Sequence, residues 1–422
     1  MVLKRRSFIK TALAAGSIAM LPNTIFAVPN TRKQRRVVII GGGFAGATAA
    51  KYIKLWGPQY EVILIERNAQ FVSCPQSNLV LGGTRSLQDL TQDYQGLSDK
   101  GIQTVQAEVV AIDTDKQQVR LHDGVEMSYD RVVIAPGVDF IYDDLPMLAN
   151  YQAQQRIPHA WKAGPQTALL QQQLHNMKQG GTMVMTVPTG PLRCPPGPYE
   201  RACQVAYYLK HHNPTAKLIV LDANADIMSK KGLFKAAWKK YYADFIEYIP
   251  SNAIDDIDVA TLTVETEFDS YSADVLNVIP PQRAGKVAEL AGVINVDERW
   301  CKVDFLSYES TVKKNVHVIG DAIAAKLPKS GHMANAQAKV CAAAIVSLLS
   351  EQLPEQEPVI NNTCYSFIDN EQAVHVAAVY RYNKEQQAMI AMPGGGVSDA
   401  PSELEGAYAN AWAKNIWADA LS

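Results

Sequence analysis

Residues 37–66 read VVIIGGGFAGATAAKYIKLWGPQYEVILIE, and they indicate the fold class of the chain. The β-branched run Val37–Ile40 is typical of a buried parallel strand. The turn that follows carries glycine at its first, third and sixth positions, and an Ala-rich, helix-forming segment comes next. A second apolar run, Val62–Ile65, ends at Glu66. The pattern predicts a strand–turn–helix–strand unit that opens a doubly wound α/β sheet.

The glycine spacing in this unit meets the needs of dinucleotide binding. Gly41 permits a tight turn, Gly43 lets the backbone approach a pyrophosphate, and Gly46 lets the helix pack close to the strand. The helix N-terminus offers free N–H groups to the phosphates. Glu66, twenty positions after Gly46, can accept hydrogen bonds from ribose hydroxyls. A glycine turn also occurs in other doubly wound sheets, but the acid in register favours a dinucleotide site.

The N-terminus has the features of an export signal. Residues 4–10 read KRRSFIK and precede an apolar stretch, and Ala27 offers a small residue for cleavage. We expect a twin-arginine signal peptide over residues 1–27 and a periplasmic protein. The remaining chain has 36 Lys and Arg against 42 Asp and Glu, a formal net charge of −6, which argues against nucleic acid as a partner. No later stretch suits membrane insertion.

Cysteine usage is compatible with redox chemistry and gives no metal signature. The chain has six cysteines, at positions 74, 194, 203, 301, 341 and 364. None shows CxxC spacing, and the histidines form no ligand cluster with them, so we expect no metal site. In an oxidising compartment some of them are expected to form a disulfide. We expect Cys203 and Cys341 to be small buried residues of helices.

Further strands are predicted beyond the first unit. Residues 102–133 alternate like an antiparallel meander, with its first strand over residues 102–110. Residues 129–137 and 316–322 each predict a buried strand that ends in a glycine turn. Asp321 in the second of these turns suits a hydrogen bond to a ribityl hydroxyl. It also suits a helix N-cap.

Residues 181–222 predict a second nucleotide fold that has lost its phosphate cradle. Strands are expected over 182–187 and 218–221, with a helix over 199–212 between them. The turn before the helix reads PTGPLRCPPGP at positions 188–198. Prolines lack the N–H groups and the conformational freedom that a phosphate cradle needs. We therefore predict the architecture of a nicotinamide-binding domain without its NAD(P)H site.

This proline-rich turn carries Cys194 just ahead of the predicted helix, with Glu200 in the first helical turn. A thiol near a helix N-terminus has its thiolate favoured, so we expect Cys194 to be more exposed or more activated than Cys364. Glu200 could act as a base, or it could simply complement the helix dipole. At this point redox and structural roles for Cys194 stay equally open.

Six motifs in order resemble the flavoprotein subunit of flavocytochrome c sulfide dehydrogenase, and they extend from about Arg36 to the C-terminus. They are IGGG at 40–43, Cys74 with its Ser and Asn neighbours, RCPPGPYER at 193–201, IPPQRAGK at 279–286, PKSG at 328–331 and NTCY at 362–365. The resemblance implies a glutathione-reductase-like α/β fold. That fold has two Rossmann-type nucleotide-binding domains, FAD in the first of them, and a C-terminal α+β region.

The resemblance also assigns roles to individual residues. Cys74 matches the cysteine that is joined to the flavin through a thioether, and Cys194 and Cys364 match a redox-active disulfide. Cys364 is expected in a polar turn over residues 361–365. Glu200 is the third predicted catalytic residue. The predicted FAD contacts are Gly41, Gly43, Phe44, Ala45, Gly46, Glu66, Arg67, Cys74, Val109, Ala135, Gly137, Asp321 and Lys329.

The activity implied is periplasmic sulfide oxidation. Hydrosulfide would attack the disulfide, and electrons would pass through FAD to a c-type cytochrome. The cytochrome would be a separate subunit, because this chain has no CxxCH motif. Two alternatives are a sulfide:quinone oxidoreductase at the membrane surface and a non-catalytic flavoprotein partner in sulfur oxidation. Trp412 and Trp417 lie in an acidic C-terminal segment, which favours core packing or a subunit contact over membrane binding.

These inferences predict five segments. They are a signal peptide at 1–27, a first part of the FAD domain at 36–150, a second Rossmann-like domain at 151–275, a second part of the FAD domain at 276–345, and a C-terminal region at 346–422.

Overall fold

The computed structural model describes residues 34–422, which form one compact unit. The predicted signal peptide lies outside the described residues. The first sheet is parallel throughout, with strand order β19-β9-β1-β2-β5. Its strands are β1 (Arg36–Ile40), β2 (Glu61–Glu66), β5 (Gln103–Gln106), β9 (Arg131–Ile134) and β19 (Val316–Val318). The buried apolar runs of the sequence therefore form the strands that were predicted for them.

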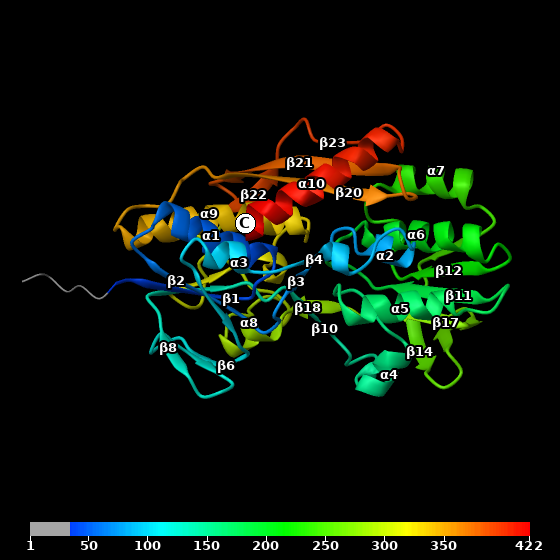
Figure 1. The fold of residues 1–422 in the computed structure, drawn as a ribbon, viewed down its shortest axis with the longest axis horizontal. Coiled ribbons are helices and arrows are strands. Elements are labelled where there is room, and N and C mark those ends of the chain that lie inside the picture. The colour runs from blue at the N-terminus through cyan, green and yellow to red at the C-terminus, as the bar shows by residue number, and fades with distance from the viewer. Residues whose placement is uncertain (1–33) are drawn as a thin grey trace, which may run out of the picture. The chain divides into compact units, whose positions relative to one another are not determined.

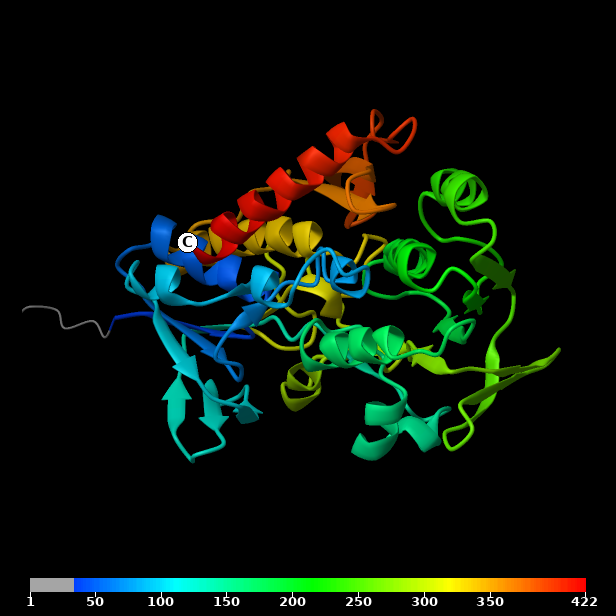
Figure 2. The same ribbon diagram turned by 45° about the vertical axis from the view of Figure 1, so that its right-hand side comes forward.

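Helices cover one face of this sheet. The Ala-rich helix α1 (Phe44–Trp56) packs against α9 (Gly331–Leu349), and α10 (Glu403–Leu421) lies along α1 (Figures 1 and 2). Ala47, Ala49 and Ala50 are fully buried, and such small side chains let helices approach closely. An antiparallel meander accompanies the sheet. It consists of β6 (Val109–Asp113), β7 (Gln118–Leu121) and β8 (Glu126–Ser128).

The prediction of one antiparallel strand over residues 102–110 is wrong. Gln103–Gln106 pair in parallel with β2, and only Val109 begins the meander. The backbone N–H of Ala107 donates to the carbonyl of Glu66 and extends the parallel ladder. Alternation of polar and apolar residues predicts a strand, but it does not say which strand will be its partner.

A second parallel sheet has the order β13-β12-β11-β17. The predicted strand–turn–helix–strand unit is confirmed as β11, α6 and β12. The elements here are β11 (Thr182–Val187), β12 (Lys217–Asp222), β13 (Ile246–Pro250), β17 (Val275–Val278), α5 (Pro165–His175), α6 (Gly197–His212) and α7 (Lys231–Tyr241). The predicted class, a glutathione-reductase-like α/β fold with two such sheets, is confirmed. The domain boundaries stay a prediction, because residues 34–422 form a single unit.

Short elements join these sheets. The strand β10 (Val138–Phe140) pairs antiparallel with β18 (Gln282–Ala284), which connects the segments that enter and leave the second sheet. The others are β3 (Phe71–Val72), α2 (Asn78–Leu81), β4 (Thr91–Gln92), α3 (Gln95–Ser98), α4 (Tyr151–Arg156), β14 (Ile254–Asp258), β15 (Thr263–Thr266), β16 (Ser270–Ser272), α8 (Lys286–Leu290) and three short 3-10 turns, Gln88–Leu90, Pro146–Leu148 and Gly320–Ala322.

The C-terminal region is an antiparallel sheet with α10 packed on it. Its strands are β20 (Val359–Phe367), β21 (Ala373–Asn383), β22 (Ala388–Ala391) and β23 (Gly396–Val397). The predicted polar turn at residues 361–365 is wrong, since Cys364 lies inside β20 opposite Val376. Asn362 is polar and buried. Its burial is tolerated because the hydroxyl of Ser330 donates a hydrogen bond to its side-chain oxygen.

The tryptophans of α10 pack inward. The indole N–H of Trp417 donates to Ser73 Oγ at 2.9 Å. The Trp412 ring lies 6.0 Å from that of His332 and 5.9 Å from that of Tyr365, centroid to centroid. Both side chains are partly buried and pack against the core, and the alternative of a subunit contact stays a prediction. Across residues 34–422, no helix is sufficiently long and apolar to span a bilayer. The burial predicted for Cys203 and Cys341 is also confirmed.

Candidate active site

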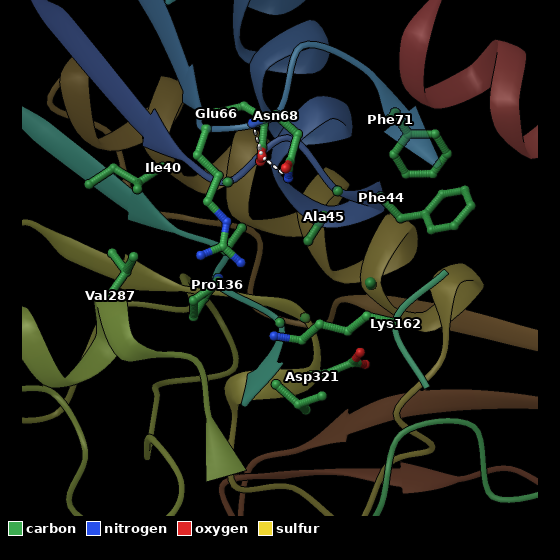
Figure 3. A pocket seen from close by; sticks show the side chains of 18 of the residues that line it. Ile40, Phe44, Ala45, Glu66, Asn68, Phe71, Pro136, Lys162, Val287 and Asp321 are labelled. Atoms are coloured by element: carbon green, nitrogen blue, oxygen red, sulfur yellow. Dashed lines mark hydrogen bonds between the residues drawn. The ribbon is translucent and has the colours of Figure 1, made fainter. Parts of the chain in front are cut away.

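A cavity of about 530 Å³ opens where the carboxyl ends of β1, β9 and β19 meet (Figure 3). Ligands of doubly wound sheets bind at this edge. Eleven of the thirteen predicted FAD contacts line it: Gly41, Gly43, Phe44, Ala45, Glu66, Arg67, Cys74, Val109, Ala135, Gly137 and Asp321. The other two, Gly46 and Lys329, do not.

The glycine turn fits a pyrophosphate. Gly41 has φ of +104°, and a Cβ there would lie 2.3 Å from the carbonyl oxygen of Ala135. A Cβ on Gly46 would lie 1.8 Å from the carbonyl oxygen of Gly41, so Gly46 acts through close helix packing. Gly43 caps α1 and borders the cavity, and a Cβ there would meet no protein atom within 4 Å. The turn thus leaves open space beside the helix N-terminus, where phosphates bind.

Glu66 is held at the edge of the cavity. Its Oε2 accepts the N–H of Gly42 at 2.7 Å. Its Oε1 accepts the backbone and side-chain N–H groups of Asn68 at 2.9 and 2.7 Å (Figure 3). The carboxylate keeps lone pairs for the hydroxyls of a ribose. Sequence reasoning missed Asn68, although an Asn two residues after an acid commonly hydrogen-bonds locally.

Asp321 presents its carboxyl group to the cavity, and no described residue hydrogen-bonds its side chain. Burial raises the pKa of this group, while Arg193 and Lys329 oppose the shift. A half-buried carboxyl with no hydrogen-bond partner among the described residues fits a ligand hydroxyl that donates to it. The glycine turn, Glu66 and Asp321 together therefore fit an FAD.

Lys329 lies behind Asp321 rather than on the cavity wall. Its Nζ donates to the carbonyl oxygens of Asp321 at 2.7 Å and Ile323 at 2.8 Å. It also lies 3.8 Å from the centroid of the Trp300 ring. Burial lowers the pKa of Lys329 to about 8, and Asp321 opposes that shift. The structure assigns this lysine to the support of the Asp321 turn.

An ion pair that sequence reasoning missed also lines the cavity. Lys162 Nζ lies 2.6 Å from Asp139 Oδ1, and the backbone N–H of Lys286 donates to Asp139 Oδ2 at 2.7 Å. Burial lowers the pKa of Lys162, and Asp139 opposes that shift. Neither residue stands at a strand–glycine junction, so local pattern gave no signal for them.

The two predicted redox cysteines lie close enough for the charge of Cys364 to raise the pKa of Cys194. Arg193 is on the cavity wall, and Cys194 follows it with the left-handed φ of +57°. The N–H of Cys194 donates to the carbonyl of Lys329 at 2.7 Å. Cys364 comes from β20, and the amide of Asn362 donates to its Sγ at 3.3 Å. Every cysteine in residues 34–422 carries a free thiol, so the pairing stays a prediction.

The prediction that the helix N-terminus favours the thiolate of Cys194 is wrong, because the pKa of the thiol is raised. Although the residue keeps some exposed surface, burial of the thiol raises its pKa. The negative charges of Glu200 and Cys364 raise it further, and Lys230 and Arg193 lower it. The surroundings of the thiol therefore outweigh the effect of the helix dipole.

Glu200 is buried beside these cysteines. Its Oε1 accepts the N–H of Phe367 at 2.8 Å, and its Oε2 accepts the amide of Asn78 at 2.8 Å. Burial raises the pKa of this carboxyl, and both hydrogen bonds oppose the shift. Glu200 thus connects α6 with β20 and α2. Within residues 34–422, no cluster of three or more His, Cys, Asp or Glu side chains could bind a metal.

The second nucleotide fold has its ribose-binding position filled. Asp222 ends β12 and is fully buried. Its Oδ2 accepts the hydroxyls of Tyr199 at 2.8 Å and Tyr248 at 2.9 Å. Its Oδ1 accepts the backbone N–H of Asn224 at 2.9 Å and the side-chain amide of the same residue at 2.8 Å, so that both oxygens accept two hydrogen bonds. A carboxylate so engaged is not available to a nicotinamide dinucleotide, which supports the prediction made from the prolines.

Comparisons with known proteins place this geometry in a class. Family models match residues 35–160 (pyridine nucleotide-disulphide oxidoreductase), 167–280 (sulfide dehydrogenase [flavocytochrome c] flavoprotein chain, central) and 356–421 (flavocytochrome c sulphide dehydrogenase, flavin-binding). The sulfide:quinone oxidoreductase structure from Aquifex aeolicus superposes with a TM-score of 0.74 at 20% identity, covering 92% of this chain and 91% of that one. The fold and site define a flavin-dependent oxidoreductase of the disulphide oxidoreductase class.

Two relatives narrow this class. The mitochondrial sulfide:quinone oxidoreductase of Mus musculus is 23% identical over 338 residues, 75% of this chain and 72% of that protein. The sulfide dehydrogenase [flavocytochrome c] flavoprotein chain of Chlorobaculum thiosulfatiphilum is 50% identical over 46 residues, 11% of this chain and 96% of that one. The chain belongs to the flavocytochrome c sulfide dehydrogenase flavoprotein family, a relative of the sulfide:quinone oxidoreductases.

Millimolar NADH or NADPH is expected to leave the flavin of this protein oxidised, because Asp222 is occupied and the turn before α6 lacks a phosphate cradle. An anaerobic absorbance record after addition of each nucleotide checks this, with dithionite as the positive control for reducibility. Rapid bleaching by either nucleotide would show that the second fold still binds a nicotinamide.

Proposed function

We propose that this chain is a periplasmic sulfide dehydrogenase flavoprotein, which oxidises sulfide through a Cys194–Cys364 disulfide and FAD and passes electrons to a c-type cytochrome subunit. One observation carries the proposal. Two cysteines, 170 positions apart in sequence, lie close enough for charge on one to shift the pKa of the other. Cys194 directly follows Arg193 in the chain, and Arg193 lines the dinucleotide cavity.

The proposed chemistry at the pair is thiol–disulfide exchange with an inorganic nucleophile. Hydrosulfide attacks one sulfur and forms a new S–S bond, and the Cys194–Cys364 bond breaks. One cysteine then carries a persulfide and the other a thiolate. FAD, when bound, supplies an acceptor for the electron pair that can release electrons singly. Buried Glu200, whose charge acts on Cys194, is the candidate group for holding a proton.

Covalent attachment of the FAD through Cys74 is part of the proposal. Cys74 lines the cavity, and the turn that carries it is closed by the Ser77 N–H donating to the Cys74 carbonyl at 3.0 Å. Trp417 anchors the neighbouring Ser73 through its hydroxyl. The C-terminal helix therefore anchors the residue that precedes Cys74.

A second candidate is quinone reduction. It is favoured by the similarity to a sulfide:quinone oxidoreductase over 75% of the chain. Membrane binding by the tryptophans of α10 is disfavoured, because both are partly buried and pack against the core of the protein. Parallel assays with a soluble quinone and with c-type cytochrome as acceptor, together with partitioning onto lipid vesicles, separate the two candidates.

Anaerobic titration of the flavin-loaded protein with sulfide tests the proposal. The oxidised flavin band should disappear as sulfide is added, and oxidised cytochrome c should restore it. A flavin that sulfide does not bleach would overturn the enzyme and leave a non-catalytic flavoprotein partner in sulfur oxidation. Bleaching that only a quinone reverses would favour the second candidate.

A further inference from the structure

Lys230 is a buried lysine in surroundings that disfavour both its charge and its backbone conformation. It directly precedes α7 and is 7% exposed. Its backbone is left-handed, with φ 56° and ψ 33°, a conformation that costs free energy in a residue other than glycine. A positive charge at a helix N-terminus is also unfavourable. Burial and the helix dipole therefore disfavour the charge of Lys230, and the left-handed backbone disfavours a residue other than glycine at this position.

The contacts of Lys230 direct its ammonium to the cysteine site. Nζ donates to the carbonyl oxygen of Cys364 at 2.9 Å and to Ser366 Oγ at 2.8 Å. Among the ion pairs of residues 34–422, none includes Lys230, whereas its neighbours Lys231 and Lys235 both pair with Asp226 at the surface. Lys230 is thus a buried cation held by neutral oxygens alone.

The negative charges that act on Lys230 come from β20, from α6 and the turn before it, and from α10. Burial lowers its pKa, and four acidic groups oppose this shift. They are Cys364, Glu200, Cys194 and Glu405. Reciprocally, Lys230 and Arg193 are the groups that lower the pKa of Cys194. Two of the four acidic groups are the predicted redox pair, and they gain negative charge only when their bridge is opened.

We propose that Lys230 is a positioning residue that compensates the negative charge released when the Cys194–Cys364 bridge is opened. The inference rests on the proposed function, since it takes the two cysteines as a redox pair. Hydrosulfide brings one negative charge into this buried site, and that charge remains there as a thiolate once the persulfide has formed. The ammonium of Lys230 hydrogen-bonds the backbone carbonyl of Cys364 in β20, and there it offsets that charge. Lys230 is not among the residues that line the flavin cavity.

The test measures thiol reactivity in the absence of sulfide. Wild type, Lys230→Met and the surface control Lys231→Met are reduced with dithiothreitol. Each is then alkylated with iodoacetamide over a pH series, and the Cys194 and Cys364 peptides are quantified by mass spectrometry. Lys230→Met should raise the pH midpoint of alkylation by about one unit, so alkylation near neutral pH slows roughly tenfold. Lys231→Met should match wild type.

Two further variants separate charge from packing. Lys230→Arg keeps the charge and should return the midpoint close to that of wild type. Ser366→Ala keeps Lys230 but removes one of the two hydrogen-bond acceptors of its ammonium. It should shift the midpoint in the same direction as Lys230→Met by a smaller amount. If Lys230→Met does not fold, an unshifted midpoint in Ser366→Ala overturns the proposal, as does equality of Lys230→Met and Lys231→Met.

The outcome is independent of turnover. A wild-type protein that sulfide cannot reduce, but whose cysteines show the Lys230-dependent midpoint, defeats the proposed function and keeps this inference. If sulfide reduces the protein normally and the pH midpoint of alkylation does not change in Lys230→Met, the proposed function stands and the inference is defeated.

Discussion

Replacement of Cys364 by serine is expected to abolish reduction of the flavin by sulfide, with a loss on the order of 10³-fold or more, while the protein stays folded and yellow. The reason is that serine cannot form the S–S bond that hydrosulfide attacks. Cys194→Ser should have the same effect, because both sulfurs are needed for the bridge. Stopped-flow absorbance after anaerobic mixing with sulfide measures the rate directly.

The competing explanation is a disulfide that only stabilises the fold. Its loss would lower the free energy of unfolding by ~2–5 kcal/mol, and sulfide would still reduce any folded protein. Cys341→Ala is the matched control, since this thiol is buried in helix α9 away from the cavity. Normal sulfide:cytochrome c activity in either Cys194→Ser or Cys364→Ser would defeat the mechanism.

Replacement of Cys74 by serine is expected to convert the flavin from a bound group that survives denaturation into one that is released completely. Cys74 lies on the cavity wall, and a thioether to the flavin requires its sulfur. Acid precipitation of the wild-type protein should leave a yellow pellet. The Cys74→Ser pellet should be colourless, with free FAD in the supernatant.

Cys194→Ser is the control for this second experiment, because it removes a thiol near the cavity and should leave the flavin attached. Mass spectrometry of the Cys74 peptide should show the added mass of the flavin nucleotide in wild type. Free FAD in the supernatant of precipitated wild-type protein would mean that Cys74 only borders a non-covalent flavin.

The sequence alone predicted the features that depend on neighbouring residues. The strand, glycine turn and helix over residues 37–56 follow from β-branched residues, glycine spacing and helix propensity, and the structure confirms each element. The loss of a phosphate cradle at 188–198 could be predicted for the same reason, because proline removes its own N–H whatever its surroundings. The glycine pattern also predicted a phosphate site at the N-terminus of the first helix, and the cavity borders that turn.

Long-range packing decided the rest. Only the tertiary structure shows that Cys364 lies in strand β20, that β5 joins the parallel sheet, and that Lys162 and Asp139 meet on the cavity wall. Periodicity along a chain does not identify the partner of a strand or the depth of a side chain. The pKa of Cys194 depends on how deeply its thiol is buried and on Glu200, and the sequence suggested the opposite direction. Lys230 resembles its surface neighbour Lys231 in sequence, and only the fold buries one and exposes the other.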